Sequence, residues 1–117
     1  MAEGISPNYV IRNISYASLS SVPSGVTLRN VSLRKQGNVV SGYIEVSAPS
    51  NEVRVIGTIS NSELYPDAKV FFPIWNASDS SYMGYLDIST SGEVKTHPIS
   101  GLSGNKYIAG HVDYIIM

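Results

Sequence analysis

Residues 70–94 read VFFPIWNASDSSYMGYLDISTSGEV and carry the clearest secondary-structure signal in the chain. An apolar and aromatic run at 70–75 precedes a polar loop at 76–81, after which alternate positions are occupied by Tyr82, Gly84, Leu86 and Ile88. Successive side chains of a strand point to opposite faces, so this alternation predicts a strand with one buried face. A Ser-Gly turn at 91–92 leads into a further extended segment. The stretch is therefore predicted to be strand, loop, strand, tight turn and strand.

The same pattern continues on both sides of this stretch. Further strands are predicted at 9–16, 26–35, 40–48, 53–59 and 107–117, separated by segments rich in Gly, Asn, Pro and Ser. In the third of these segments one face is expected to carry Ser41, Tyr43, Glu45 and Ser47. In the fourth, the alternation groups Val53, Val55, Gly57 and Ile59 on one face. A shift of the apolar phase between Leu28 and Val31 predicts a bulge.

About eight strands at regular spacing, with no helical period, predict an all-β fold. We expect an antiparallel β-sandwich or barrel, jelly-roll-like in arrangement. At 117 residues the chain fits one domain. Residues 1–8 are predicted to be a linker or an artificial edge of the chain, and residues 9–117 to be a single β head domain. No apolar run is long enough for a membrane span, so membrane insertion is not expected.

The composition excludes several classes of function. The formal net charge is −1 without a basic run, which disfavours nucleic acid as a partner. The absence of Cys excludes disulfides, thiolate metal sites and thiol nucleophiles. Charged residues make up only 15% of the chain, which fits a protein that buries part of its surface against other copies of itself.

The sequence contains few candidates for metal-ligating or catalytic residues. His97 and His111 are the only histidines and lack metal-ligand spacing, so no metal and no cofactor are predicted. His111 and Asp113 lie two apart on a predicted strand and face the same way, as an acid–base pair would. A polar outer face explains this pair equally well, and no nucleophile motif accompanies it. The chain is therefore predicted not to be an enzyme.

Aromatic residues on loops are the most informative remaining feature. Saccharide binding needs a flat aromatic face for the apolar side of the ring and polar side chains for the hydroxyl groups. One loop supplies both kinds of group, and its candidate ligand-binding residues are Trp75, Asn76, Asp79 and Tyr82. The competing interpretation is that Trp75 belongs to the core and that Tyr82 is an ordinary strand residue.

Two segments resemble the distal domains of bacteriophage tail proteins, YPDAKVFFPI at 65–74 and YLDISTSGEV at 85–94. In those domains a Pro-containing turn leads to a short Phe-Pro strand, followed by an alternating strand and a Thr-x-Gly turn. The hairpin at 26–40 also fits their pattern. The resemblance implies a receptor-binding or fibre-tip head domain, homotrimeric and located in the virion at the distal tail or fibre tip. Its partners would be other virion tail proteins and host cell-wall polysaccharide, bound without a cofactor. The resemblance carries over no binding residue.

Four functions are consistent with these features. The first is a trimeric head domain that binds bacterial cell-surface saccharide. The second is a structural trimeric module, either a capsid or tail decoration or a fibre-trimerisation domain, in which Trp75 and Tyr82 would be buried. The third is a monomeric carbohydrate-binding module attached to a hydrolase, and the fourth is an enzyme. The first is our prediction, and the second is its main alternative.

Overall fold

The computed structural model describes residues 14–117, and within them every regular element except one is a strand. The strands are β1 (Ile14–Ala17), β2 (Leu19–Ser20), β3 (Thr27–Gln36), β4 (Val39–Pro49), β5 (Arg54–Ile59), β6 (Val70–Asn76), β7 (Tyr82–Ile88), β8 (Glu93–Pro98) and β9 (Asn105–Ile115). The exception is a single 3-10 turn, η2 (Ser62–Leu64). No helix among these residues is long and apolar enough to cross a membrane.

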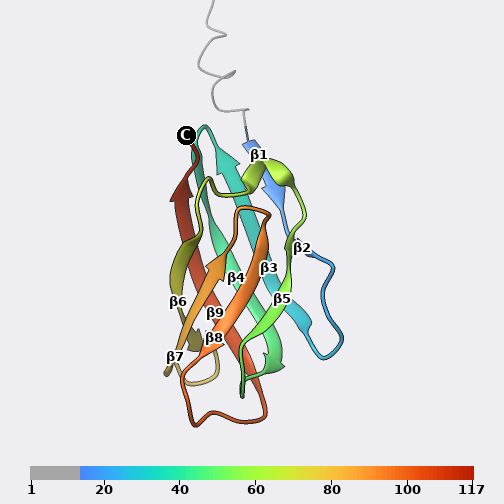
Figure 1. Cartoon of the computed structure of the whole chain (residues 1–117), viewed down its shortest axis with the longest axis vertical. Helices are drawn as coiled ribbons and strands as arrows, with labels where there is room; N and C mark the ends of the chain where they lie inside the picture. The colour runs from blue at the N-terminus through green and yellow to red at the C-terminus, as the bar shows by residue number, and fades with distance from the viewer. Residues whose placement is uncertain (1–13) are drawn as a thin grey trace, which may run out of the picture.

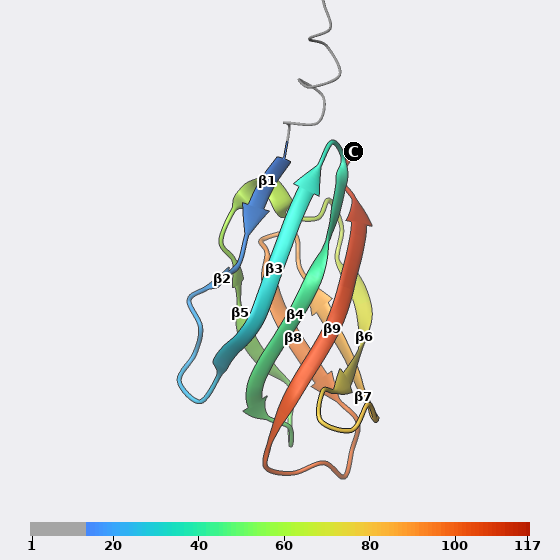
Figure 2. The ribbon, with the colours of Figure 1, turned by 180° about the vertical axis from the view of Figure 1, so that it is seen from behind.

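The strands form one antiparallel sheet in the order β1-β3-β4-β9-β6-β7-β8-β5-β2. The sheet folds over into two facing layers, with β1, β3, β4 and β9 on one side and β6, β7, β8 and β5 on the other (Figures 1 and 2). The layers join where β9 meets β6, through only two residue pairs, Trp75 with Ala109 and Asn76 with Ile108. The result is a nearly closed barrel, and the all-β antiparallel prediction is confirmed.

The opposite edge of the barrel is closed by the chain itself. β1 pairs with β3 in one layer, and β2, which follows directly, pairs with β5 in the other. The backbone N–H group of Ser18 donates to the side-chain oxygen of Ser60 at 2.9 Å, and the backbone N–H group of Ser60 donates to the carbonyl oxygen of Ser18 at 3.0 Å. Closure of this kind removes the exposed strand edges that promote aggregation.

The inner faces of the two layers bury a continuous aliphatic core. Its largest fully buried side chains include Leu33, Ile44, Ile56, Ile74, Met83 and Leu86. Tyr114 also lies inside, where its hydroxyl group donates a 2.5 Å hydrogen bond to the carbonyl oxygen of Leu64. This bond satisfies two buried polar groups at once, which would otherwise destabilise the fold.

The structure of the β3–β4 hairpin agrees closely with the prediction from the sequence. β3 and β4 pair as predicted across a turn at Gly37, and their register shifts between Leu28 and Asn30, which confirms the predicted bulge. β4 buries Val40, Ile44, Val46 and Ala48 and places Ser41, Tyr43, Glu45 and Ser47 on its other face, in the grouping that the sequence predicts.

Two of the predicted faces are correct only in part: Gly57 and Ile59 are buried in β5 and Gly84, Leu86 and Ile88 in β7, and bulges explain the departures. In β5 the register shifts between Val55 and Gly57, so Ile56 is buried while Val53 stays exposed. In the β6–β7 pair the register shifts between Ile74 and Trp75, so Met83 is buried and Tyr82 points outward. An extra residue in one strand reverses every side chain beyond it, which a uniform alternation does not anticipate.

Other differences are small. The predicted loop before β3 contains the short strand β2, which raises the number of strands in residues 14–117 to nine. The last strand begins at Asn105 and holds the apolar C-terminus only in part, since Ile115 and Met117 remain exposed. The predicted linker at 1–8 and the start of the first predicted strand lie outside the described residues.

Candidate functional site

The outward side of the β4–β9 pair carries a row of polar and aromatic side chains. The row runs from the chain-terminus end of the pair, where β9 approaches the C-terminus, to the loop end, where β9 begins. The residues directly opposite each other are Ser41 and Asp113, Tyr43 and His111, Glu45 and Ala109, Ser47 and Tyr107, and Pro49 and Asn105. We call this surface, together with Trp75 of the adjoining strand β6, the β4–β9 face. It collects residues from distant parts of the sequence because the sheet places β4, β9 and β6 side by side.

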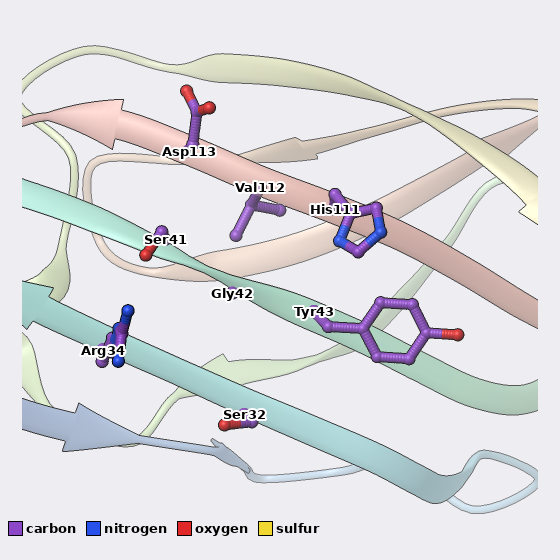
Figure 3. Close-up of a pocket in the computed structure, with 8 residues that line it drawn as sticks. All are labelled: Ser32, Arg34, Ser41, Gly42, Tyr43, His111, Val112 and Asp113. Atoms are coloured by element: carbon purple, nitrogen blue, oxygen red, sulfur yellow. The ribbon is translucent and has the colours of Figure 1, made fainter.

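The centre of the β4–β9 face is an aromatic cluster. The ring of His111 lies 5.1 Å from that of Tyr43 and 5.4 Å from that of Trp75, and the latter two are 6.4 Å apart. All three pairs are tilted, the arrangement that the quadrupoles of aromatic rings favour over a face-to-face sandwich. Figure 3 shows Tyr43 and His111 next to each other on adjacent strands. Trp75 is half-buried in this cluster rather than in the core.

A hydrogen-bonded network fixes one side of the cluster. The hydroxyl group of Tyr43 donates to Oε1 of Glu45 at 2.6 Å, and Nε of Arg29 donates to Oε2 of the same carboxylate at 2.7 Å. The Arg29 guanidinium also lies over the ring of Tyr107, 3.8 Å from its centroid, in a cation–π contact. With both oxygens of Glu45 engaged, the rings of Tyr43 and Tyr107 are held in defined positions.

The network shifts the acid–base properties of its members. The hydrogen bond to Glu45 raises the pKa of Tyr43 to about 12. Hydrogen bonds from Tyr43 and then Arg29 lower the pKa of Glu45, because both stabilise the carboxylate. At neutral pH Glu45 is therefore an anion, Arg29 a cation and Tyr43 a neutral donor.

We expect Tyr43 to ionise at a higher pH than a free tyrosine does. Its pKa is higher in the folded chain than the ordinary value of 10, so its contribution to stability is full below pH 10 and is lost as the pH approaches 12. Ultraviolet difference absorbance of wild type and Glu45→Gln measures this. The variant lacks the charged acceptor and should show one tyrosine ionising at lower pH. Identical titration curves would contradict the network.

A shallow groove of about 550 Å³ lies beside the aromatic cluster, toward the chain-terminus end of the face. Its lining side chains are Ser32, Arg34, Ser41, Tyr43, His111 and Asp113 (Figure 3). We call it groove A. It offers a cation, an anion, two hydroxyl groups and two aromatic rings, all accessible from solvent.

A second groove of about 550 Å³ lies at the loop end of the same face. Its lining residues are Ser47, Asn76, Ser78, Asn105, Lys106 and Tyr107. We call it groove B. It is more polar than groove A, with two amides, two hydroxyl groups and one ammonium group beside the phenol of Tyr107.

The structure keeps the four candidate residues predicted from the sequence in and beside the loop that joins β6 to β7, with Trp75 directly opposite Tyr82. Trp75 belongs to the aromatic cluster and Asn76 lines groove B. The side-chain oxygens of Asn76 and Asp79 accept hydrogen bonds from the backbone N–H groups of Ser78 and Ser81. These bonds shape the loop, and those from Ser81 lower the pKa of Asp79. Tyr82 pairs with Trp75 across this hairpin and is 61% exposed on the outer side of β7.

Tyr82 belongs to a second exposed aromatic surface, on the outer side of β6, β7 and β8. Phe71 is 58% exposed there and its ring lies 5.8 Å from that of Tyr85. Tyr85 in turn stacks on His97 at 4.4 Å. We call this surface the β6–β8 face. Its residues Phe71, Phe72, Pro73, Tyr82 and Tyr85 line a small groove of about 260 Å³.

The β6–β8 face also holds the closest approach of a histidine to a carboxylate. Nε2 of His97 lies 2.5 Å from Oδ2 of Asp87, a residue that is only 4% exposed. In the described part of the chain no serine or threonine hydroxyl group forms a hydrogen bond with His97. His111 likewise makes no hydrogen bond to Asp113 within residues 14–117. The same residues contain no group of three His, Cys, Asp or Glu side chains suited to a metal ion.

Sequence reasoning identified Trp75 but not its neighbours in the cluster. The sequence places Tyr43 on one face of its strand with Ser41 and Glu45, and it relates His111 only to Asp113, as a possible acid–base pair. The signal that unites them is the pairing of β4 with β9, which brings Tyr43 opposite His111. Neither strand reveals its partner in a single sequence.

Comparison with known proteins gives a structural match and no sequence match. No protein-family model matches the chain, and no curated protein matches it in sequence. Among solved structures, the chain is similar to the head domain of the lactococcal phage bIL170, described among the receptor-binding domains of lactococcal phages. The TM-score is 0.63 at 18% sequence identity, over 90% of this chain and 100% of that one. The resemblance to phage receptor-binding heads is thus confirmed at the level of the fold.

Proposed function

We propose that this chain is a host-recognition head domain of a phage tail and that its β4–β9 face binds a bacterial cell-surface saccharide without chemical change. The aromatic cluster of Tyr43, Trp75 and His111 carries the proposal. Sugars combine apolar ring faces with dense hydroxyl groups, and a site for them needs both aromatic surface and fixed hydrogen-bonding groups. The cluster supplies the aromatic surface, and grooves A and B, on either side of it, supply the hydrogen-bonding groups.

The fixed positions of these side chains support binding rather than simple exposure. Tyr43 is held by Glu45, and Glu45 is held in turn by Arg29, which also packs on Tyr107. A preorganised surface loses little conformational entropy when a ligand arrives. Shallow polar grooves of this kind favour modest affinity at each site, and a virion gains overall strength by presenting many copies.

Binding is tested by titrating the protein with wall polysaccharide purified from several bacterial strains, followed by tryptophan fluorescence. Trp75 is the only tryptophan, so any change in emission reports on the aromatic cluster directly. We expect one polysaccharide to produce a saturable change. A polysaccharide that binds by calorimetry without altering the emission would place the ligand elsewhere and contradict the proposed site.

The second candidate function is a purely structural trimeric module, and the β6–β8 face is the observation that favours assembly. Exposed aromatic side chains in one patch are typical of contacts between subunits. We propose that this face, centred on Phe71 and Tyr85, lies between copies in a homotrimer, while the β4–β9 face remains open to the host. The two functions share this assembly, and only saccharide binding distinguishes them.

The assembly makes a direct prediction for the β6–β8 face. Phe71→Ser should convert a trimer into monomers, because it removes exposed apolar surface that the contact would bury. Light scattering coupled to size exclusion measures the mass. Tyr16→Ser is the matched control, since Tyr16 is 66% exposed on the distant strand β1 and should leave the trimer intact. A wild-type chain that elutes as a clean monomer would contradict the trimer.

A further inference from the structure

We infer that the ligand of the β4–β9 face is an extended, linear stretch of polysaccharide several sugar units long, which crosses the aromatic cluster and occupies grooves A and B together. This inference rests on the proposed function and specifies the form of its ligand. A site for a single terminal sugar would need only one groove beside the cluster.

The two grooves lie at opposite ends of one strand pair. Groove A includes the pairs Ser41 with Asp113 and Tyr43 with His111, whereas groove B includes Tyr107 opposite Ser47 and extends to Asn105. Eight residue steps along β4 lead from Ser41, in the first pair of this row, to Pro49, in the last, which corresponds to roughly 27 Å at about 3.4 Å per residue. This length is several times that of one sugar ring.

Trp75 and Glu45 cover the part of the face that lies between the two grooves. Ala109 points outward at this point of β9 and is nevertheless fully buried, so larger neighbouring side chains cover it. Trp75 faces Ala109 across the β6–β9 seam, and Glu45 faces it from β4. A chain that follows the strand pair therefore passes over aromatic surface at the centre and over polar grooves at both ends.

The chemistry of the grooves fits this path. Arg34, Asp113 and serine hydroxyl groups line one end, and Lys106, Asn76 and Asn105 line the other. The side chains at each end can donate hydrogen bonds to sugar hydroxyl groups and accept hydrogen bonds from them, and the aromatic cluster can stack against a ring face. Occupying both ends at once adds contacts without a second loss of translational freedom, so longer fragments should bind more tightly.

The test compares fragment lengths. The wall polysaccharide that binds the wild-type chain is cut by partial acid hydrolysis and separated by size, and the dissociation constant of each fraction is measured by calorimetry. We expect the affinity to rise at least tenfold from the shortest fractions to those that span the face, and then to level off. An affinity that does not depend on length would overturn the inference while leaving the proposed function in place.

A variant of groove B separates this inference from other causes of length dependence. Asn105→Ala combined with Lys106→Ala should abolish the tenfold advantage of long fragments over the shortest ones. Lys69→Ala, an exposed residue outside both grooves, is the control, and circular dichroism checks that each variant is folded. If long fragments keep their advantage in the groove B variant, they bridge neighbouring copies, and the inference is wrong. Absence of binding by every wall polysaccharide would overturn the inference and the proposed function together.

Discussion

Replacing Trp75 with alanine is expected to weaken saccharide binding by about 2 kcal/mol, or roughly thirtyfold in Kd, which is the scale of a binding hot spot. The indole supplies the largest flat surface in the aromatic cluster, and it lies against His111 at 5.4 Å. Its removal takes away stacking area for the sugar. It also frees the imidazole of His111 to change position, so the loss should exceed that of one contact.

The Trp75 prediction needs controls for folding. Trp75 lies on the outer side of β6 while Ile74 fills the core, so the alanine variant should unfold cooperatively at a moderately lower temperature. Trp75→Phe should recover part of the affinity, because it restores a smaller aromatic face. Tyr16→Ala should bind as the wild type does. Calorimetry with the wall polysaccharide measures all three variants, and a folded Trp75→Ala variant with unchanged Kd would exclude the cluster as the binding site.

Gly84→Ala is expected to lower the free energy of unfolding by on the order of 3 kcal/mol, a large effect for one methyl group. Gly84 lies in the bulge of β7 with φ of +124°, a conformation that residues with a Cβ rarely adopt. A Cβ at this position would also lie 2.1 Å from the carbonyl oxygen of His97 and 3.1 Å from the backbone nitrogen of Ile99. Both contacts are with backbone, which cannot move aside without breaking the β7–β8 pairing.

A second glycine distinguishes the two causes of this destabilisation, which are backbone strain at positive φ and steric overlap of the Cβ with neighbouring backbone atoms. Gly101 also has a positive φ, +92°, but a Cβ there would meet no atom within 4 Å. Gly101→Ala should therefore cost only the backbone strain, about 1 kcal/mol. Urea denaturation followed by circular dichroism gives both values. Equal losses in the two variants would show that the close approach of β8 to Gly84 does not matter.

Much of the fold was predictable because most strands alternate regularly. The turn at Gly37, the bulge after Leu28 and the outward face of β4 all follow from local pattern and turn chemistry. The burial of Ile56 and Met83 and the exposure of Tyr82 did not, because bulges beside Gly57 and Gly84 interrupt the alternation. A glycine in a strand marks a possible bulge, but the pairing partner decides which residue becomes the extra one.

The candidate site was predictable only in part, and for a related reason. Trp75 is conspicuous in the sequence, whereas Tyr43 and His111 become its neighbours through the order of β4, β9 and β6 in the sheet. Likewise, Asn76 and Asp79 looked suited to bind hydroxyl groups, yet each first satisfies the backbone of its own loop. Long-range strand order is set by the whole core, and local composition does not encode it.

In the proposed function, the β4–β9 face attaches this protein to a polysaccharide on a bacterial surface. The most direct test of this claim is the adhesion of fluorescently labelled protein to intact cells of a binding strain, before and after chemical extraction of the wall polysaccharide, with Trp75→Ala measured in parallel. We predict saturable binding to untreated cells that disappears after extraction and falls strongly in the variant. Binding that survives extraction, or that the folded variant retains in full, would contradict the claim.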